Sequence, residues 1–435
     1  MKANKVLMFL LVLCMVFVIA ACSNGNTPIE NAGSSDQPAS GEKAADAETP
    51  AKDVTIKVFQ FKVGPFVDAF TELAGIYEKE TGVKVEIETH GGGADYGAML
   101  KAEIASGSEP EIYNNGGFSS LTEYMDRTVE LTDQPWVSNL IEVTKANTTV
   151  DGKLYGMPMN TEGYGIIYNK DLFAKAGITT EPRTLPELKD AVSKLQEAGI
   201  TPFSATNEWW SLGIHLVNIA VANQPDPAQF VADLVEGRTT IKGNGVFEEW
   251  LDLIDLIFEN AQGNMLTTDF TTQVAHFAMG EAAMLPQGNW MQPDLDAIDP
   301  NLNMGVLPYS INDQPGHVFM GVPNNWIVNS KSEHPEEALA FLDWMVNSDE
   351  GKTYMTREFQ FMPAFNNIDA PKEEIGVLAA AIIEQSDRSL GWHWDRFPNG
   401  VTQGFGAAMQ EYQGKQITRE QLLEKLDKAV KDILN

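Results

Sequence analysis

The stretch that decides the fold is DGKLYGMPMNTEGYGIIYNKDLFAKAGI, residues 151–178. The Asp-Gly pair at 151–152 is a strong hairpin signal between two short strands. The glycines within 161–165 predict a flexible crossing, because glycine leaves the backbone free to bend. An apolar strand over 166–169 and a short helix over 170–176 follow. The stretch therefore predicts strand, crossing, strand and helix.

Strands and helices also alternate on the N-terminal side of this stretch. A β-rich run at 54–61 precedes an amphipathic helix, and the alternating residues 83–89 form the next predicted strand. Two strands joined in this way pair in parallel through a right-handed crossover, which indicates an α/β fold. Ligands bind such sheets just beyond the carboxyl ends of strands, where the sequence places residues 60–62, His90 and residues 114–115.

The N-terminus has the order of a lipoprotein signal. Two lysines precede an apolar run over 6–21, which ends in small residues before Cys22 and looks like a bacterial lipobox. We expect residues 1–21 to be removed and Cys22 to carry lipid, including palmitate, on the outer face of the plasma membrane; an uncleaved anchor is the alternative. Residues 22–53 are small and polar and predict a flexible tether, because they cannot bury enough apolar surface to fold.

The composition excludes several classes of function. With 435 residues, 43% of them hydrophobic, the chain is long enough for two domains. The formal net charge of −31 becomes −33 when residues 1–21 are removed, so nucleic acid is not an expected partner, whereas a neutral ligand is compatible. Cys14 and Cys22 are the two cysteines, which leaves the exported part without a disulfide or a thiol nucleophile.

No metal or cofactor is expected. Asp294, Asp296 and Asp299 lack the spacing, glycine and terminal glutamate of an EF-hand loop, so caps and turns explain them better. The glycines after His90 match neither a phosphate-binding loop nor a dinucleotide fingerprint, and a tight turn explains them.

Four segments carry a resemblance to a known family. They are the sequences DGKLYGMP and YNKDLFAKAGI within 151–178, GITPFSATNEWW at 199–210, FAMGEAAMLPQGNW at 277–290, and GVPNNWIVNSKSEHPEEALAFLDWMVNSDEGKTYM at 321–355. These segments resemble the extracellular solute-binding proteins of sugar ABC transporters, the group that includes maltose-binding protein. The resemblance runs from about residue 55 to the C-terminus.

The resemblance implies a periplasmic-binding-protein-like fold of class II, in which two α/β lobes enclose a ligand cleft. It places residues 54–159 and 318–360 in the first lobe and residues 160–317 and 361–435 in the second. The implied function is that of the substrate-binding lipoprotein of a carbohydrate ABC importer, a monomer that captures an oligosaccharide and delivers it to the transmembrane permease subunits. The segment near Glu208 is nearest to raffinose, melibiose or multiple-sugar binders, and the identity of the sugar stays open.

The resemblance also implies where the sugar binds. A pyranose has one apolar face and a rim of hydroxyls, which flat aromatic rings and carboxylates suit. On its own residues Glu162 is a solvated loop side chain, whereas the family places it at the sugar. Trp326 sits inside a strand and packs in the core as readily as in the cleft, and one of Trp209 and Trp210 fits a helix core. The candidate sugar-binding residues are Glu162, Glu208, Trp209, Trp210, Trp290, Trp326, Trp392, Trp394, Asn115 and His90.

Other classes of function remain open at this level. A secreted, cell-attached glycoside hydrolase or lyase also needs aromatic residues and two carboxylates, for which Glu162 and Glu208 are the nominal pair. The sequence does not give the separation of these carboxylates. An adhesin without a transporter differs from the receptor only in its partners. Because the resemblance covers almost the entire exported chain, we expect a receptor with no enzymatic activity.

Overall fold

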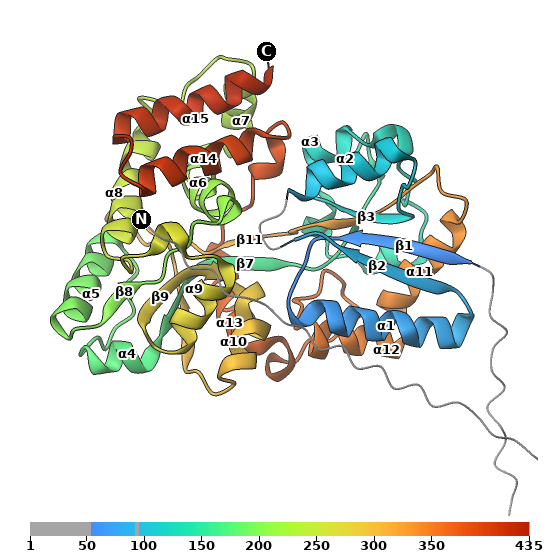
Figure 1. The fold of residues 1–435 in the computed structure, drawn as a ribbon, viewed down its shortest axis with the longest axis horizontal. Coiled ribbons are helices and arrows are strands. Elements are labelled where there is room, and N and C mark those ends of the chain that lie inside the picture. The colour runs from blue at the N-terminus through green and yellow to red at the C-terminus, as the bar shows by residue number, and fades with distance from the viewer. Residues whose placement is uncertain (1–53, 92–94, 435) are drawn as a thin grey trace, which may run out of the picture. The chain divides into compact units, whose positions relative to one another are not determined.

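The computed structural model describes residues 54–91 and 95–434, so the predicted signal peptide, tether and lipidated Cys22 lie outside the described residues. The described strands form two five-stranded sheets and one short hairpin, with helices packed against the sheets (Figure 1). None of the described helices combines the length and hydrophobicity that a membrane span requires. The mixture of sheets and covering helices confirms the predicted α/β class.

The first sheet has the strand order β2-β1-β3-β12-β6. β1 (Thr55–Gln60) pairs in parallel with β2 (Lys84–Thr89) and with β3 (Ile112–Asn115), as the predicted crossover requires. β12 (Asn325–Val328) lies antiparallel between β3 and β6 (Met157–Pro158), although it comes far later in the chain. Two distant segments of the chain therefore build this sheet together.

Alternate residues of β1 face two different helical layers, because successive side chains of a strand point to opposite faces of a sheet. Val58 packs with residues of α1 and α11, whereas Phe59 packs with Leu100 of α2. α1 and α12 lie on one side of the sheet and α2 and α3 on the other (Figure 1). These helices are α1 (Pro65–Thr81), α2 (Tyr96–Ser106), α3 (Phe118–Thr122), α11 (Pro335–Asn347) and α12 (Asp349–Thr353).

The predicted hairpin turn is confirmed. β4 (Thr149–Val150) and β5 (Lys153–Leu154) pair antiparallel on either side of it. Both turn residues have positive φ, 51° at Asp151 and 76° at Gly152. Such a turn matches the twist of the two flanking strands, and aspartate and glycine are the residues that adopt it at low cost.

The second sheet is built around β7 (Glu162–Asn169). β7 lies antiparallel to β9 (Ala282–Gly288), to β10 (Met304–Leu307) and, over its first three residues, to β11 (Phe319–Gly321). β8 (Thr201–Phe203) extends the sheet by pairing in parallel with β9. All eight residues of β7 are buried, which makes this strand the centre of the second sheet.

The prediction of a flexible crossing over 161–165 is wrong, because β7 starts at Glu162 and runs through these glycines. Pairing with two neighbouring strands holds the segment extended. The glycines serve close packing instead of bending. A Cβ at Gly163 would come within 2.5 Å of the Ile382 side chain, and a Cβ at Gly165 within 2.5 Å of the Leu307 carbonyl oxygen.

Two apolar cores flank the second sheet. Ile166 packs into the core that includes α5, α8 and α14, whereas its neighbour Ile167 packs into the core of α9, α10 and α13. α7, α14 and α15 pack together at the edge of the first of these cores (Figure 1). The helices of this part are α4 (Lys170–Lys175), α5 (Leu185–Glu197), α6 (Val217–Ala222), α7 (Pro227–Val235), α8 (Gly245–Glu259), α9 (Phe270–Ala278), α10 (Gln292–Ile298), α13 (Lys372–Ile383), α14 (Val401–Gln413) and α15 (Arg419–Leu434).

The strand pairing bears on one predicted lobe boundary. The prediction returns the chain to the first lobe at residue 318, but β11 still pairs with β7 in the second sheet. The chain joins the first sheet only at Asn325, where β12 begins. The crossing therefore lies between Gly321 and Asn325, and the other predicted lobe boundaries stay predictions.

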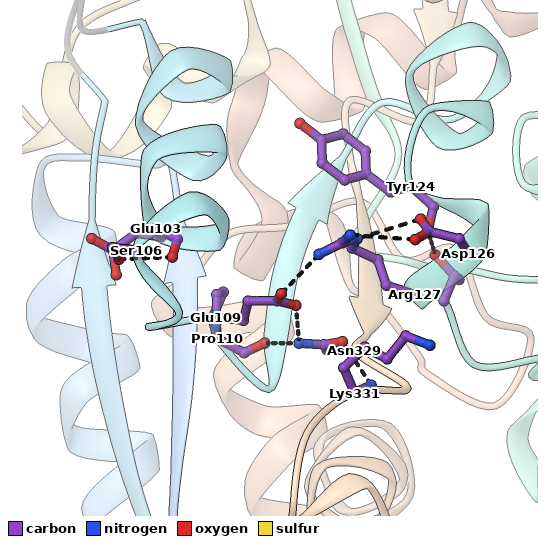
Figure 2. A network of polar contacts seen from close by, with 10 residues as sticks. Glu103, Ser106, Glu109, Pro110, Tyr124, Asp126, Arg127, Asn329 and Lys331 are labelled. Atoms are coloured by element: carbon purple, nitrogen blue, oxygen red, sulfur yellow. Dashed lines mark hydrogen bonds and ion pairs between the residues drawn. The ribbon is translucent and has the colours of Figure 1, made fainter.

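A polar network joins the segment before β3 to the end of β12 (Figure 2). Glu109 is its centre: Oε1 accepts a bond from Arg127 Nη1 at 2.8 Å, and Oε2 accepts one from Asn329 Nδ2 at 3.0 Å. Asn329 Nδ2 also donates to the Pro110 carbonyl at 3.2 Å. These bonds hold β3 and β12 together where the regular ladder ends.

We expect Arg127→Ala to lower the free energy of unfolding by about 1 kcal/mol, because Glu109 loses its charged partner at a partly buried position. Urea denaturation measures the change. Lys153→Ala is the matched control, since Lys153 pairs with Glu130 at 2.7 Å but is 54% exposed, and its effect should stay within about 0.5 kcal/mol. Equal effects of the two substitutions would show that the network contributes no more than a surface pair.

Candidate functional site

A cavity of about 620 Å³ lies where the strand ends of both sheets meet. From the first sheet, its wall includes Phe61 and Lys62 after β1, His90 after β2, and Asn114 and Asn115 at the end of β3. These are the three strand ends that the sequence marks as ligand positions. The volume lies within the range of roughly 300–1,000 Å³ that is typical of small-molecule sites.

The second sheet and its helices give the cavity an aromatic wall. Trp392 and Trp394 pack together with ring centroids 4.5 Å apart. The imidazole of His215 lies 4.7 Å from the ring of Trp290 and 5.5 Å from that of Trp394. Trp210 meets the same imidazole edge to face at 5.4 Å. All five rings line the cavity.

Trp290 is oriented by buried amides beneath it. It lies two residues after the end of β9, and its indole Nε1 donates to Gln287 Oε1 at 3.2 Å. Gln287 in turn donates to Gln273 Oε1 at 3.0 Å, so the accepting amide is itself held in place. A Cβ at Gly288 would come within 2.3 Å of the Trp290 ring, which therefore needs glycine at that position to fold back over the strand.

His215 reaches the cavity from a π-helical turn, Ser211–Leu216. Such turns contain one extra residue, and they occur frequently at functional sites. The imidazole stacks on Tyr164 of β7 at 5.0 Å. Burial lowers the pKa of His215 to about 3, so the ring is neutral at physiological pH. It therefore presents a neutral hydrogen-bonding group to the cavity.

An ion pair across the cavity joins the two sheets. Lys62 Nζ binds Glu162 Oε1, and the side chains of the pair are only 12% and 6% exposed. The loop that carries Lys62 is held by Gln60, whose Oε1 accepts a bond from Lys62 N at 2.6 Å. Asn160 Nδ2 also donates to Glu162 Oε1, at 3.2 Å. The predicted carboxylate, Glu162, is thus in the cavity wall, and it is already paired with Lys62 of the first lobe.

Several buried polar atoms on residues of the wall have no hydrogen-bond partner among the described residues. They belong to different chemical types, amide nitrogen, amide oxygen, indole nitrogen and imidazole nitrogen. Because a buried polar atom without a partner is costly, these atoms would be satisfied by a ligand that donates and accepts hydrogen bonds if their side chains turned toward the cavity. The atoms are Asn114 Nδ2, Gln360 Oε1, Trp392 Nε1 and His215 Nδ1.

Besides the exposed Asp95, which caps α2, two further carboxyl groups line the cavity without a salt bridge among the described residues. Burial raises the pKa of Asp294 to about 6, although the positive charge of Lys62 opposes the shift. Burial raises the pKa of Asp395 to about 7, against a hydrogen bond from the Trp394 side chain. The Asp395 carboxylate lies 2.2 Å from where a Cβ at Gly116 would be, so this contact between the lobes requires glycine.

Comparison with known proteins gives the family. The family model described as bacterial extracellular solute-binding protein matches residues 63–352. The chain belongs to the bacterial extracellular solute-binding proteins. The melibiose/raffinose/stachyose-binding protein MelE of Bacillus subtilis (strain 168) is 23% identical over 416 residues, which are 90% of this chain and 92% of that protein. The sn-glycerol-3-phosphate-binding periplasmic protein UgpB of Rhizobium meliloti (strain 1021) is 25% identical over 275 residues, 62% of this chain and 60% of that protein.

Solved structures show the same fold. The structure of the solute-binding protein RafE in complex with raffinose has a TM-score of 0.76 to this chain at 20% identity, and the match covers 88% of this chain and all of that one. The predicted family and the predicted two-lobed fold are therefore confirmed. As a member of an extracellular family, this solute-binding protein functions outside the cytoplasm.

Most of the predicted site residues of this solute-binding protein line the cavity, and their contact with a sugar stays a prediction. The side chains of two of them already form hydrogen bonds within the protein. Asn115 Nδ2 donates to the Ser120 carbonyl at 3.1 Å, and His90 Nε2 bonds with Glu88 Oε1 at 2.6 Å. The predicted residues in the wall are Glu162, Trp209, Trp210, Trp290, Trp392, Trp394, Asn115 and His90.

Two predicted site residues do not line the cavity. Trp326 is 2% exposed and packs against Phe70 at 5.6 Å, because β12 is an inner strand whose two faces are both covered. Glu208 Oε1 accepts a bond from Phe270 N at 3.2 Å, at the start of α9, where a helix favours a negative charge. Trp326 is thus a core residue and Glu208 supports a helix end. Glu162 and Glu208, the nominal enzyme pair, do not face the same space.

Sequence reasoning missed several residues of the wall. Lys62 and Asn114 lie at marked strand ends, but their side chains carried no assigned role. His215 gave no signal, because a π-helical turn has no distinctive sequence pattern. The interpretation of Asp294 as a cap or turn residue misses that it faces the cavity. Asp395 directly follows Trp394, a predicted site residue, and this position in the chain was the only indication that Asp395 belongs to the cavity wall.

Proposed function

We propose that this protein captures an oligosaccharide in the cavity and delivers it to the permease subunits of a carbohydrate ABC importer. One observation carries the proposal. The same cavity combines a wall of tryptophan rings with buried polar atoms of mixed type that have no partner among the described residues. The apolar ring faces of a saccharide can stack on the tryptophan rings, and its hydroxyls can donate to or accept from the polar atoms.

The energies are consistent with this assignment. Covering one sugar face with an indole buries roughly 100–200 Å² of apolar surface, which at about 25 cal/mol/Å² stabilises the complex by a few kcal/mol per ring. Association costs offset much of this gain, so a micromolar dissociation constant, about −8 kcal/mol, needs several rings and several hydrogen bonds. The wall supplies the rings, with its tryptophans on the second lobe, and it has polar residues on both lobes, such as Asn114 on the first.

The comparisons support sugars as the ligand class. MelE is named for melibiose, raffinose and stachyose, and solved neighbours hold raffinose and stachyose. These three sugars are the first to test. A calorimetric titration of the exported domain should give micromolar binding of at least one of them, accompanied by a change in tryptophan fluorescence. Absence of binding across a panel of neutral oligosaccharides would contradict the proposal.

The same titration separates a receptor from an enzyme. Chromatography of the bound sugar after prolonged incubation should recover it unchanged. Release of smaller sugars by the wild type, abolished in Glu162→Gln, would instead assign glycoside hydrolysis. Size-exclusion chromatography with and without ligand should give a monomer.

We also propose that cleavage before Cys22 and lipidation of its thiol hold the protein at the outer face of the plasma membrane. The support is the charged, apolar and small-residue order of residues 1–22. Cys22→Ser should release the protein from the membrane fraction into the medium, which immunoblotting of the two fractions measures. Retention of an uncleaved, membrane-bound Cys22→Ser protein would show that residues 1–21 are an ordinary anchor.

A further inference from the structure

We infer that the cavity selects its ligand by charge, taking a neutral saccharide and excluding one that carries a phosphate or carboxylate group. The inference rests on the proposed function and adds the chemical class of saccharide that the cavity takes. It follows from the charged side chains of the wall and from the type of polar atom left without a partner there.

The positive side chains of the wall are already paired. Within the described residues, the lysines that line the cavity are Lys62 and Lys101, and no arginine joins them. Lys62 binds Glu162 in a largely buried pair. Lys101 binds Glu123 at 2.8 Å and is 52% exposed, which places it at the rim. A bound anion would compete with Glu162 or Glu123 for the positive charge of these lysines.

Negative groups, in contrast, are unpaired. Asp294 projects from α10 and Asp395 follows Trp394, and neither forms a salt bridge within residues 54–91 and 95–434. Both carboxyl groups lie close to glycines of the first lobe. A Cβ at Gly64 would come within 2.8 Å of Asp294 Oδ1, and a Cβ at Gly116 within 2.2 Å of Asp395 Oδ1. Burial raises the pKa of Asp294 to about 6 and that of Asp395 to about 7, so both are ionised at pH 8.

The unpartnered atoms of the wall suit hydroxyls better than a phosphate. Phosphate sites in proteins use arginine forks, lysines or several backbone N–H groups. The unpartnered buried atoms that belong to wall residues are instead the neutral donors Asn114 Nδ2 and Trp392 Nε1 and the acceptor Gln360 Oε1. A hydroxyl can serve either kind of atom, whereas an ionised phosphate or carboxylate cannot donate to Gln360 and is repelled by the unpaired carboxylates.

The family alone does not decide this question. Relatives of similar identity are named for neutral sugars and for sn-glycerol 3-phosphate. The charges of the wall distinguish the two ligand classes, because a phosphate binder needs the cations that this wall has already paired.

A matched pair of ligands tests the inference. Raffinose and the uronate made by oxidising C6 of its galactose differ by one carboxylate, and glycerol 3-phosphate serves as a small anion. Titration calorimetry at pH 8 should show the wild type binding raffinose at least about 100-fold more tightly than the uronate, with no binding of glycerol 3-phosphate. Asp395→Asn should reduce the raffinose-to-uronate ratio to about tenfold or less, and Asp294→Asn should reduce it in the same direction.

Asp190→Asn is the matched control, because Asp190 lies on the surface of α5, is 65% exposed and pairs with Lys194; its ratio should equal that of the wild type. A purely structural role of Asp395 would weaken both ligands alike and leave the ratio unchanged. Equal binding of raffinose and uronate by the wild type, or an unchanged ratio in both cavity variants, overturns the inference while the proposed function stands. A wild type that binds no neutral saccharide overturns the proposed function, and the inference with it.

Discussion

Replacement of Trp290 by alanine is expected to weaken oligosaccharide binding by more than tenfold, a few kcal/mol. The indole lines the cavity and is held by its bond to Gln287 and by its contact with His215. Its loss removes one stacking face and also leaves the imidazole without a neighbour that keeps it in position. Titration calorimetry measures the effect without relying on the fluorescence of the residue that has been removed.

Trp344→Ala is the matched control for Trp290→Ala. Trp344 lies on α11, packs against Tyr77 and donates its Nε1 to Glu80, and it is not a residue of the cavity wall. Affinity should be unchanged in this variant, although stability will fall somewhat. If Trp290→Ala keeps the affinity of the wild type, the aromatic wall does not hold the sugar and the cavity has been assigned to the wrong ligand class.

Glu162→Gln is expected to reduce affinity about 100-fold, more than the loss of one ligand hydrogen bond would explain. The substitution leaves Lys62 charged at a position where its side chain is only 12% exposed, and breaking such a buried pair costs about 3–5 kcal/mol. Because the two side chains belong to different lobes, the cost falls on the state in which the lobes meet around the ligand. Calorimetry and urea denaturation should both register it.

A double-mutant cycle separates the ion pair from direct contact with the sugar. Lys62→Met alone should also weaken binding, because Glu162 would then be the unpaired charge. The loss of binding free energy in the double variant should be about 1–3 kcal/mol smaller than the sum of the two single losses, since the double variant removes both charges at once. Additive losses would show that Lys62 and Glu162 act independently, and that the pair is not what joins the lobes.

The local features of this fold were predictable from the chain because they depend on neighbours in sequence. Asp151 and Gly152 predict a hairpin turn, and both have the positive φ that such a turn requires. The β-rich run at 54–61 predicts β1, whose Val58 and Phe59 face opposite cores. The conspicuous tryptophans after strands predict an aromatic site, and most of them line the cavity.

Features that depend on distant segments were not predictable. β7 extends through glycines that suggest flexibility, because β9 and β11 pair with it, and because Ile382 of α13 and the Leu307 carbonyl of β10 fill the space that side chains at Gly163 and Gly165 would need. The sequence places Trp326 inside a strand and leaves core and cleft open for it; in the structure it lies in an inner strand under a helix, whereas Trp290 lies beyond the end of a strand. A tryptophan inside a strand can face either a core or a cleft, so only the packing of other segments decides where Trp326 lies.

The sequence by itself determined the α/β order of elements, the family and the inventory of rings and carboxylates, since these follow from periodicity and from motifs contained within short segments. Only the tertiary structure decided which of those groups share one cavity and what they are paired with. It brought Lys62 to Glu162 across 100 residues of chain, took Glu208 to a helix end and added His215, Asp294 and Asp395 to the wall. The physical reason is that burial and charge pairing depend on which surfaces meet, and that depends on the folded chain as a whole.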